Sequence, residues 1–270
     1  IVRLKLLIFL TQKTSPRPLF VFLPGMDGTG FSLQAQRDGL DEYFNACYLS
    51  MPPSDRSGWG ELTERTATLI KMEQERNPGQ ITITCGESFG GCLALSLISR
   101  FPDLCDQLIL VNPASSARQQ IWLHSCSAFT KLLPVPLYNL SALGLCDLLI
   151  ASLRVRKPMK RRLLFAMQSL GPQNAAWRLL LLRRFDVDDF ALHRSPPSTL
   201  ILVSGADYLL PSRSEASRLT GYFPGARILV LPQSGHACLL ESQVNLLALL
   251  KSYAEEADWP LSYQAVGSGQ

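Results

Sequence analysis

Short runs of apolar or β-branched residues recur along the chain, and each run ends where turn-forming residues begin. The runs lie at residues 19–23, 81–85, 108–111, 200–203 and 228–231. Uninterrupted runs of this kind are typical of strands that are buried on both faces of a parallel sheet. Ligands of such sheets bind beyond the carboxyl ends of the strands, so we expect the functional residues directly after the runs.

Segments with helical periodicity alternate with these runs, which predicts an α/β fold. The predicted helices lie at residues 60–76, 92–100, 121–133, 137–153 and 174–184. We expect a mostly parallel central sheet with helices on both faces, built from residues 1–114 and 196–265. Because no strand-like run occurs within residues 115–195, this segment is predicted to be an inserted helical cap. Residues 266–270 are expected to form a flexible tail.

The composition is that of a globular domain, since 47% of the 270 residues are hydrophobic and 18% are charged. No apolar stretch reaches the roughly 18 residues that a membrane-spanning helix needs. The net charge of +4 is too small to indicate a nucleic-acid partner. The charge is uneven, however, because residues 115–195 hold twelve Lys and Arg against four Asp.

The seven cysteines are odd in number and show no C-x-x-C spacing. They indicate a reducing compartment rather than a disulfide framework or a zinc site, and we expect no metal and no cofactor. Lys5 interrupts the apolar run at residues 3–10 and no cleavage site follows, so we expect a buried strand there rather than a signal peptide. Because the chain begins with Ile1 and not with Met, we also expect residues to precede it.

The sequence GESFG at residues 86–90 lies between a predicted strand and a predicted helix. The G-x-S-x-G pattern alone occurs by chance in many proteins, and a plain glycine-rich turn is the alternative. In a strand–turn–helix context the pattern is typical of a tight turn that exposes a nucleophilic serine at the start of the helix. Ser88 is therefore the candidate nucleophile.

A serine hydroxyl needs a base to remove its proton, and the chain has three histidines. His236 follows the last strand run, where this topology has its catalytic base. His124 lies in an apolar helix and His193 in a loop before two prolines, so packing or exposure to solvent explains these two better. Asp207 follows the penultimate strand run and precedes His236, as the acid in the order Ser, Asp, His should.

The oxyanion of an acyl-transfer reaction needs two backbone N–H donors. We expect one from Phe89, directly after the nucleophile, and the other from Met26 in the glycine-rich loop at residues 24–30. No Lys-Ser/Thr pair follows Gly30, which excludes a Walker phosphate loop. Asp27 either orients this loop or caps the next turn, and it is also a candidate substrate contact.

The predicted cap is expected to select the substrate. Its apolar residues suit an acyl-chain pocket, and Trp122 and Phe129 are candidate substrate contacts. Some of the apolar residues of the cap must nevertheless pack on the sheet. A group of basic residues suits peripheral contact with an anionic membrane, the alternative being a solvated helix face. These residues are Arg154, Arg156, Lys157, Lys160, Arg161 and Arg162.

The chain resembles the hydrolase-like half of the plant chloroplast phytyl ester synthases and their cyanobacterial or algal relatives, within the α/β-hydrolase superfamily. The similar segments are FLPGMDGTG at 22–30, CGESFGGCLAL at 85–95, LVNPA at 110–114, DYLLPSRSE at 207–215 and SGHACLLE at 234–241. This resemblance implies an α/β-hydrolase fold, with Ser88, Asp207 and His236 at the matching catalytic positions. It also implies acyl transfer from galactolipid, acyl-carrier or acyl-CoA donors to phytol or diacylglycerol, in a plastid or in the cyanobacterial cytoplasm.

The plant enzymes continue into an acyltransferase-like region with an H-x4-D motif. The motif needs an acidic residue five positions after the histidine, and neither His124 nor His193 has one. His236 has Glu241 at this distance, but the two are predicted to belong to the loop and helix that follow the last strand run. The primary prediction is therefore a serine hydrolase that cleaves a hydrophobic or lipidic ester through an acyl-enzyme. The alternatives are an acyltransferase with an alcohol acceptor and a lipid-binding module with little turnover.

Overall fold

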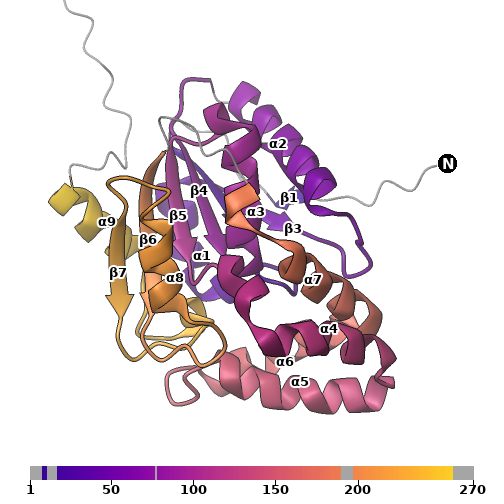
Figure 1. Cartoon of the computed structure of the whole chain (residues 1–270). Coiled ribbons are helices and arrows are strands. Elements are labelled where there is room, and N and C mark those ends of the chain that lie inside the picture. The colour runs from indigo at the N-terminus through magenta and orange to yellow at the C-terminus, as the bar shows by residue number, and fades with distance from the viewer. Residues whose placement is uncertain (1–7, 11–16, 77, 190–196, 258–270) are drawn as a thin grey trace, which may run out of the picture.

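A seven-stranded sheet forms the centre of the computed structural model, which describes residues 8–10, 17–76, 78–189 and 197–257 (Figure 1). The strands are β1 (Ile8–Leu10), β2 (Leu19–Leu23), β3 (Asn45–Ser50), β4 (Thr82–Glu87), β5 (Gln107–Val111), β6 (Ser198–Ser204) and β7 (Arg227–Leu231). Their order in space is β1-β3-β2-β4-β5-β6-β7. The strand β1 runs antiparallel to β3, and all other neighbours are parallel. The predicted, mostly parallel sheet is confirmed.

Helices cover both faces of this sheet, as predicted. They are α1 (Arg37–Tyr43), α2 (Trp59–Arg76), α3 (Phe89–Arg100), α8 (Ser212–Leu219) and α9 (Leu246–Ala257). Successive residues of a strand point to opposite faces. Accordingly Val21 packs in a core cluster with residues of α2, α3 and α8, whereas its neighbour Phe22 packs in a second cluster with residues of α1 and α9.

Four further helices follow β5 and precede β6, and we call them together the cap. They are α4 (Ile121–Leu132), α5 (Val135–Leu149), α6 (Lys157–Leu170) and α7 (Pro172–Arg184). Short 3-10 turns complete the described chain: η1 (Phe31–Gln36), η2 (Pro102–Leu104), η3 (Ala114–Gln119), η4 (Val187–Asp189) and η5 (Cys238–Leu240). In Figure 1 the helices α4, α5 and α6 lie beyond the end of the sheet towards which the arrow of β7 points.

Several elements differ from the sequence prediction. The strand β3 was not predicted, because the polar Asn45 and Ser50 bound it and only four residues between them are apolar. The run at 228–231 forms an edge strand, since β7 pairs only with β6 among the described strands. Its Ile228 and Val230 are each 39% exposed, so the expectation of burial on both faces is wrong for this strand.

Some predictions fall on residues that the structure does not describe. Of the N-terminal run, only β1 is described, and the predicted tail at 266–270 and His193 lie outside the described residues. His124 lies on α4, and its side chain is likewise not described. Within the described ranges, no helix combines the length and apolar character that crossing a bilayer requires.

Candidate active site

Ser88 lies at the sharp turn between β4 and α3, with φ 52° and ψ −111°. Only Ser88 and Asn112 have positive φ among the described non-glycine residues. This conformation carries about 1–3 kcal/mol of strain, so the surroundings must hold it. The Ser88 N–H donates to the carbonyl of Val111 at 3.0 Å, and the Ser88 carbonyl accepts from the N–H of Ala114 at 3.0 Å. The end of β5 and the residues after it therefore fix the turn.

Glycines allow neighbouring backbones to approach this turn. A Cβ atom at Gly90 would lie 2.0 Å from the carbonyl oxygen of Leu23, at the end of β2. A Cβ atom at Gly86 would lie 2.5 Å from the carbonyl oxygen of Gly90. Any larger residue at these positions would push the turn away from the sheet, and the serine with it.

The structure brings the three predicted triad residues together. The Nε2 atom of His236 lies 2.8 Å from Oγ of Ser88, and its Nδ1 atom lies 2.7 Å from Oδ2 of Asp207. Asp207 follows β6 and His236 follows β7, so residues from three different loops meet at the carboxyl edge of the sheet. The His236 and Asp207 side chains are 4% and 1% exposed.

Backbone donors hold the carboxylate of Asp207. Its Oδ1 atom accepts from the N–H groups of Leu209 at 2.9 Å and Leu210 at 3.0 Å, and Oδ2 also accepts from the hydroxyl of Ser212. Burial alone would raise the pKa of Asp207. The facing His236 and these donors outweigh burial, and the net pKa of Asp207 is lowered. An ionised acceptor at this position can hold one ring orientation of His236.

Asn112 holds the histidine loop, a role that was not predicted from the sequence. Its side-chain Nδ2 donates to the carbonyl of His236 at 2.7 Å and to Oγ of Ser204 at 2.8 Å. Its Oδ1 accepts from the N–H of Ser204 at 2.8 Å. The residue is fully buried and therefore ties the ends of β5 and β6 to the histidine loop. An asparagine before a proline, directly after a buried strand, was the available signal.

The two expected oxyanion donors lie next to Ser88 and in the loop after β2. Phe89 is the first residue of α3, so its N–H has no acceptor within the helix. The N–H of Gly28 donates to the carbonyl of Gly25 at 3.0 Å and closes a turn around Met26. The Gly25 carbonyl and the Met26 N–H belong to one peptide unit and point in opposite directions, so this turn directs the Met26 N–H away from Gly28.

Two carboxyl groups lie close to this loop. Glu87 is 3% exposed and accepts the hydroxyl of Ser32 at Oε2, while its Oε1 has no hydrogen-bond partner among the described residues. Burial raises the pKa of Glu87 to about 7. Asp27 accepts the N–H of Thr29 at 2.8 Å, as expected for a residue that shapes the turn, and burial raises its pKa. Glu87 was not predicted from the sequence, because any residue can occupy that position of the motif.

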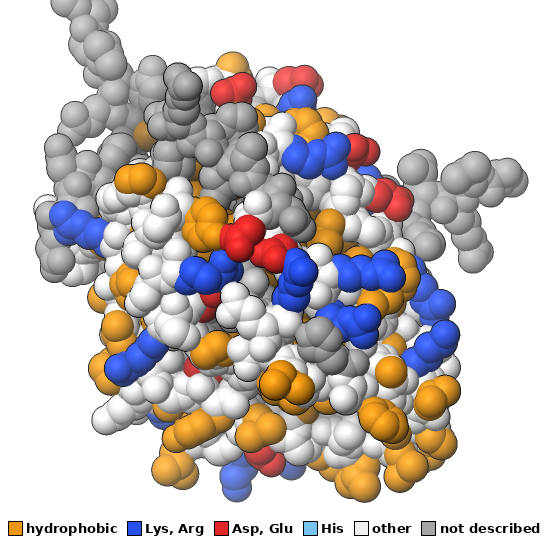
Figure 2. Space-filling view, in the orientation of Figure 1, with side chains coloured by type: hydrophobic (Ala, Val, Ile, Leu, Met, Phe, Trp, Pro, Cys, Tyr) orange, Lys and Arg blue, Asp and Glu red, His pale blue; other side chains and the backbone are white. Residues whose placement is uncertain are grey.

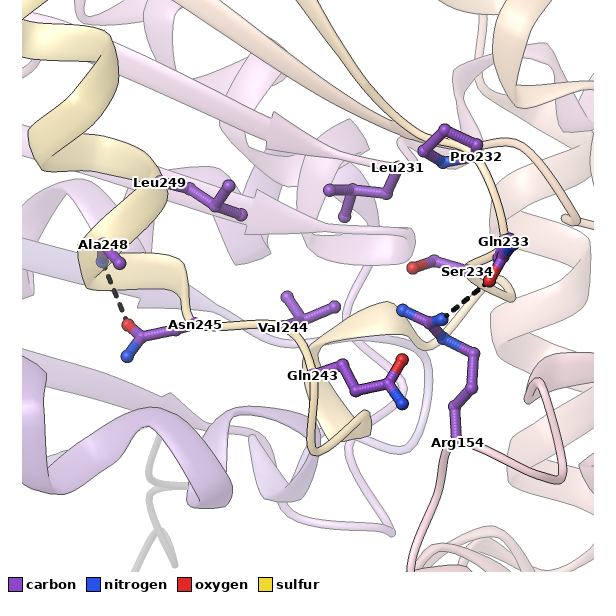
Figure 3. A pocket seen from close by; sticks show the side chains of 10 residues that line it. All are labelled: Arg154, Leu231, Pro232, Gln233, Ser234, Gln243, Val244, Asn245, Ala248 and Leu249. Carbon is purple, nitrogen blue, oxygen red and sulfur yellow. Dashed lines mark hydrogen bonds between the residues drawn. The ribbon is translucent and has the colours of Figure 1, made fainter.

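Trp122 and Phe129 lie on α4 with 41% and 68% of their surface exposed, and their role as substrate contacts stays a prediction. A pocket of about 350 Å³ lies between the strand end at Leu231 and the residues around Asn245 (Figure 3). It borders the loop that leads to His236 but does not include a triad residue. Among the described residues, no group of His, Cys, Asp or Glu side chains is arranged to hold a metal ion.

Comparisons with known proteins show the family and the fold of the chain. The family model of serine aminopeptidase S33 matches residues 54–243. Phytyl ester synthase 1, chloroplastic, from Arabidopsis thaliana is 30% identical over an alignment of 257 residues, and the match covers 87% of this chain and 36% of that protein. Phytyl ester synthase 2, chloroplastic, from the same plant is 29% identical over an alignment of 261 residues, and the match covers 87% of this chain and 37% of that protein. The chain thus spans little more than a third of these relatives.

Solved structures with the same fold include an esterase from Exiguobacterium antarcticum, with a TM-score of 0.75 and 17% identity over 92% of this chain and 95% of that one. MenH from S. aureus has a TM-score of 0.72 and 15% identity, over 92% and 97% of the two chains. These similarities confirm the predicted α/β-hydrolase fold and the resemblance to the phytyl ester synthases.

Proposed function

Because the chain belongs to the serine aminopeptidase S33 family of α/β hydrolases, we propose that it cleaves a hydrophobic or lipidic carboxylic ester through an acyl-enzyme on Ser88. The observation that carries this proposal is the continuous line of contacts from Asp207 through His236 to Ser88, at 2.7 Å and 2.8 Å. A nucleophile, a base and an orienting acid in this order are what acyl transfer requires.

In the proposed reaction, Ser88 Oγ attacks the ester carbonyl while its proton passes to Nε2 of His236. The N–H groups of Phe89 and Met26 stabilise the oxyanion of the tetrahedral intermediate. The leaving alcohol departs with the proton from His236, and the acyl group remains on Ser88. Water then attacks the acyl-enzyme, giving its proton to His236, which returns it to Ser88 as the free acid leaves.

The surface of the cap supports a hydrophobic substrate. Large apolar side chains that are exposed on α4, α5 and α6 define what we call the apolar cap surface; they are Ile121, Trp122, Phe129, Leu132, Val135, Leu137, Leu140, Leu143, Leu148 and Phe165. In Figure 2 apolar side chains gather at the lower edge of the molecule, where Figure 1 has these helices. Exposed apolar surface on this scale marks an interaction site.

We further propose that this surface contacts an anionic lipid surface, from which the ester is taken. Basic residues accompany the apolar ones in the same segment, including Lys131 at the end of α4 and Lys157 at the start of α6. Apolar side chains beside basic ones are the pattern of interfacial binding to anionic lipid. The chloroplastic relatives support a plastid membrane as the setting.

Flotation with lipid vesicles tests the lipid contact. We expect binding to vesicles with phosphatidylglycerol, weaker binding to pure phosphatidylcholine, and at least about tenfold weaker binding for the double variant Phe129→Ser/Leu132→Ser. Met72 on α2 is 45% exposed outside the cap, so Met72→Ser is the matched control and should bind as the wild type does. Equal binding of both variants would refute the lipid contact.

Hydrolysis of p-nitrophenyl esters from acetate to palmitate tests the enzymatic proposal. We expect a preference for medium or long chains, loss of turnover in Ser88→Ala, and labelling of the wild type by a fluorophosphonate that Ser88→Ala does not show. Labelling that survives in Ser88→Ala would refute the assignment. Vesicle binding by a wild type that cleaves no ester of the series would favour the lipid-binding module instead.

Transfer of the acyl group to an alcohol is the second candidate function, and the similarity to two phytyl ester synthases favours it. Product analysis with phytol present separates the two reactions. A phytyl ester would show that an alcohol resolves the acyl-enzyme, whereas free acid alone, at every phytol concentration, would leave hydrolysis as the reaction.

A further inference from the structure

A buried arginine of the cap reaches the loop that carries the expected oxyanion donor. Arg178 lies on α7 and is 2% exposed. Its Nη1 donates to the carbonyl of Met26 at 2.6 Å, and its Nη2 donates to the carbonyl of Pro52 at 2.8 Å. A guanidinium is expensive to bury, so its removal from water needs a compensating arrangement of acceptors and charges.

The loop is shaped to receive this side chain. Gly28 has φ 75°, and a Cβ atom there would lie 2.6 Å from Nη1 of Arg178. Burial lowers the pKa of Arg178, while the carboxylates of Asp27 and Asp55 and the phenol of Tyr138 act in the opposite direction. The loop after β2 therefore supplies an acceptor, room and a counter-charge for one residue of α7.

The position of the contact within the turn matters. The hydrogen bond from Gly28 to Gly25 makes Met26 and Asp27 the two central residues of a four-residue turn. The peptide between two such residues is the one that flips when a turn changes type. Arg178 holds the carbonyl of this peptide, and the neighbouring peptide on the other side of the Met26 Cα carries the expected oxyanion donor.

We propose that Arg178 is a positioning residue, which holds the Met26 turn in the conformation that stabilises the oxyanion and makes this conformation depend on the seating of the cap. This inference rests on the proposed function, since it concerns the oxyanion of the same reaction. Oxyanion donors act only when they are held within a fraction of an ångström of the productive position. Freeing the turn should therefore weaken the stabilisation of the transition state more than it weakens substrate binding.

Arg178→Met tests the proposal in the full chain with the p-nitrophenyl ester that the wild type prefers. We expect kcat to fall about 100-fold with KM changed less than about threefold, as for the loss of an oxyanion donor. The kcat of Arg178→Lys should lie between those of the wild type and Arg178→Met, because one ammonium group cannot replace the planar guanidinium that reaches both carbonyls. Circular dichroism and melting curves establish that each variant is folded.

Arg56→Met is the matched control. Arg56 donates to Oδ1 of Asn174 at 2.9 Å, so it also joins the core to α7, but it lies exposed at the surface and this hydrogen bond does not involve the Met26 turn. If Arg178 only anchors the cap, both variants should change KM and stability alike. An equal fall of kcat in Arg56→Met, or an unchanged kcat in folded Arg178→Met, would overturn the proposal.

A boronic acid provides a readout that a merely structural role would not move, because it forms a tetrahedral adduct on the nucleophile. Its inhibition constant should rise by the same factor by which kcat/KM falls in Arg178→Met, and an unchanged constant would count against the inference.

Should Arg178→Met not fold, Arg178→Gln and Arg178→Lys decide by the same measurements. Absence of fluorophosphonate labelling in the wild type would instead refute the proposed function, whereas equal labelling rates of wild type and variant would refute the role of Arg178.

Discussion

The Nε atom of Arg154 lies 2.5 Å from a carboxylate oxygen of Glu241, which has no exposed surface. The same carboxylate accepts the N–H of Gly235 at 2.8 Å and the hydroxyl of Ser234 at 3.0 Å, directly before His236. The segment between α5 and α6 therefore neutralises the buried charge that holds the histidine loop. Arg154, predicted to belong to a basic stretch that either contacts an anionic membrane or is solvated, thus has an internal partner.

Arg154→Met should destabilise the protein by about 2 kcal/mol, because it leaves Glu241 charged, buried and without its counter-ion. Arg154 is itself 21% exposed, which keeps the expected effect below that of a fully buried pair. Urea denaturation measures the change. Lys160→Met removes the exposed pair with Asp147 and should cost less than about 0.5 kcal/mol. Equal losses in the two variants would contradict the prediction.

Asp207→Asn should lower kcat by about 10⁴-fold with little change in the fold, because an amide does not hold the productive tautomer of His236. The exposed Asp103→Asn is the control, as it lies on η2 away from the triad and should leave kcat unchanged. Steady-state kinetics at a fixed pH measure both variants. A fall of less than tenfold in Asp207→Asn would show that another residue orients the base.

Glu87 makes stability depend on pH. Its pKa is about 7 in the folded protein against an ordinary value of 4.5, so between these values only the folded state keeps the proton. Stability therefore falls as the pH rises from about 4.5 to 7, and Glu87→Gln should remove this loss. Asp27 and His236 face the same carboxyl, Asp27 raising and His236 lowering its pKa.

Denaturation at pH 5 and pH 8 measures the effect. Relative to the wild type, Glu87→Gln should be about 2 kcal/mol more favourable at pH 8 than at pH 5. The exposed Glu61→Gln is the control and should show no such difference. A Glu87→Gln variant whose stability relative to the wild type is the same at both pH values would mean that the carboxyl is ionised throughout.

Gly90→Ala should prevent the native turn around Ser88, since its Cβ would meet the carbonyl of Leu23 at 2.0 Å. We expect loss of activity and destabilisation by more than about 3 kcal/mol. Gly144→Ala on α5 has open space around its Cβ and should stabilise the helix by about 0.5–1 kcal/mol. Thermal melting and ester hydrolysis compare the two, and a stable, active Gly90→Ala would show that the turn does not need this close approach.

A functional residue can be predicted from the sequence when its neighbours along the chain form a recognisable pattern. Ser88, Asp207 and His236 each follow an apolar run, and a parallel sheet gathers the ends of such runs at one edge. Arg178 and Arg154 act instead through contacts with residues 152 and 87 positions away along the chain. No local pattern distinguishes an arginine with internal partners, on a helix as Arg178 is or between two helices as Arg154 is, from one that is solvated, so these roles emerge only from the packing of the cap.

The strand β7, which precedes the proposed catalytic base, has a neighbour on one side only among the described strands. Because β7 is an edge strand with Ile228 and Val230 partly exposed, its fraying requires less disruption than the separation of any inner strand. Fraying there would withdraw His236 while the remaining sheet and α3 stay intact. On heating, ester hydrolysis should therefore be lost at a lower temperature than the helical circular-dichroism signal. The strand β7 is consequently the first element to stabilise in a heat-tolerant variant.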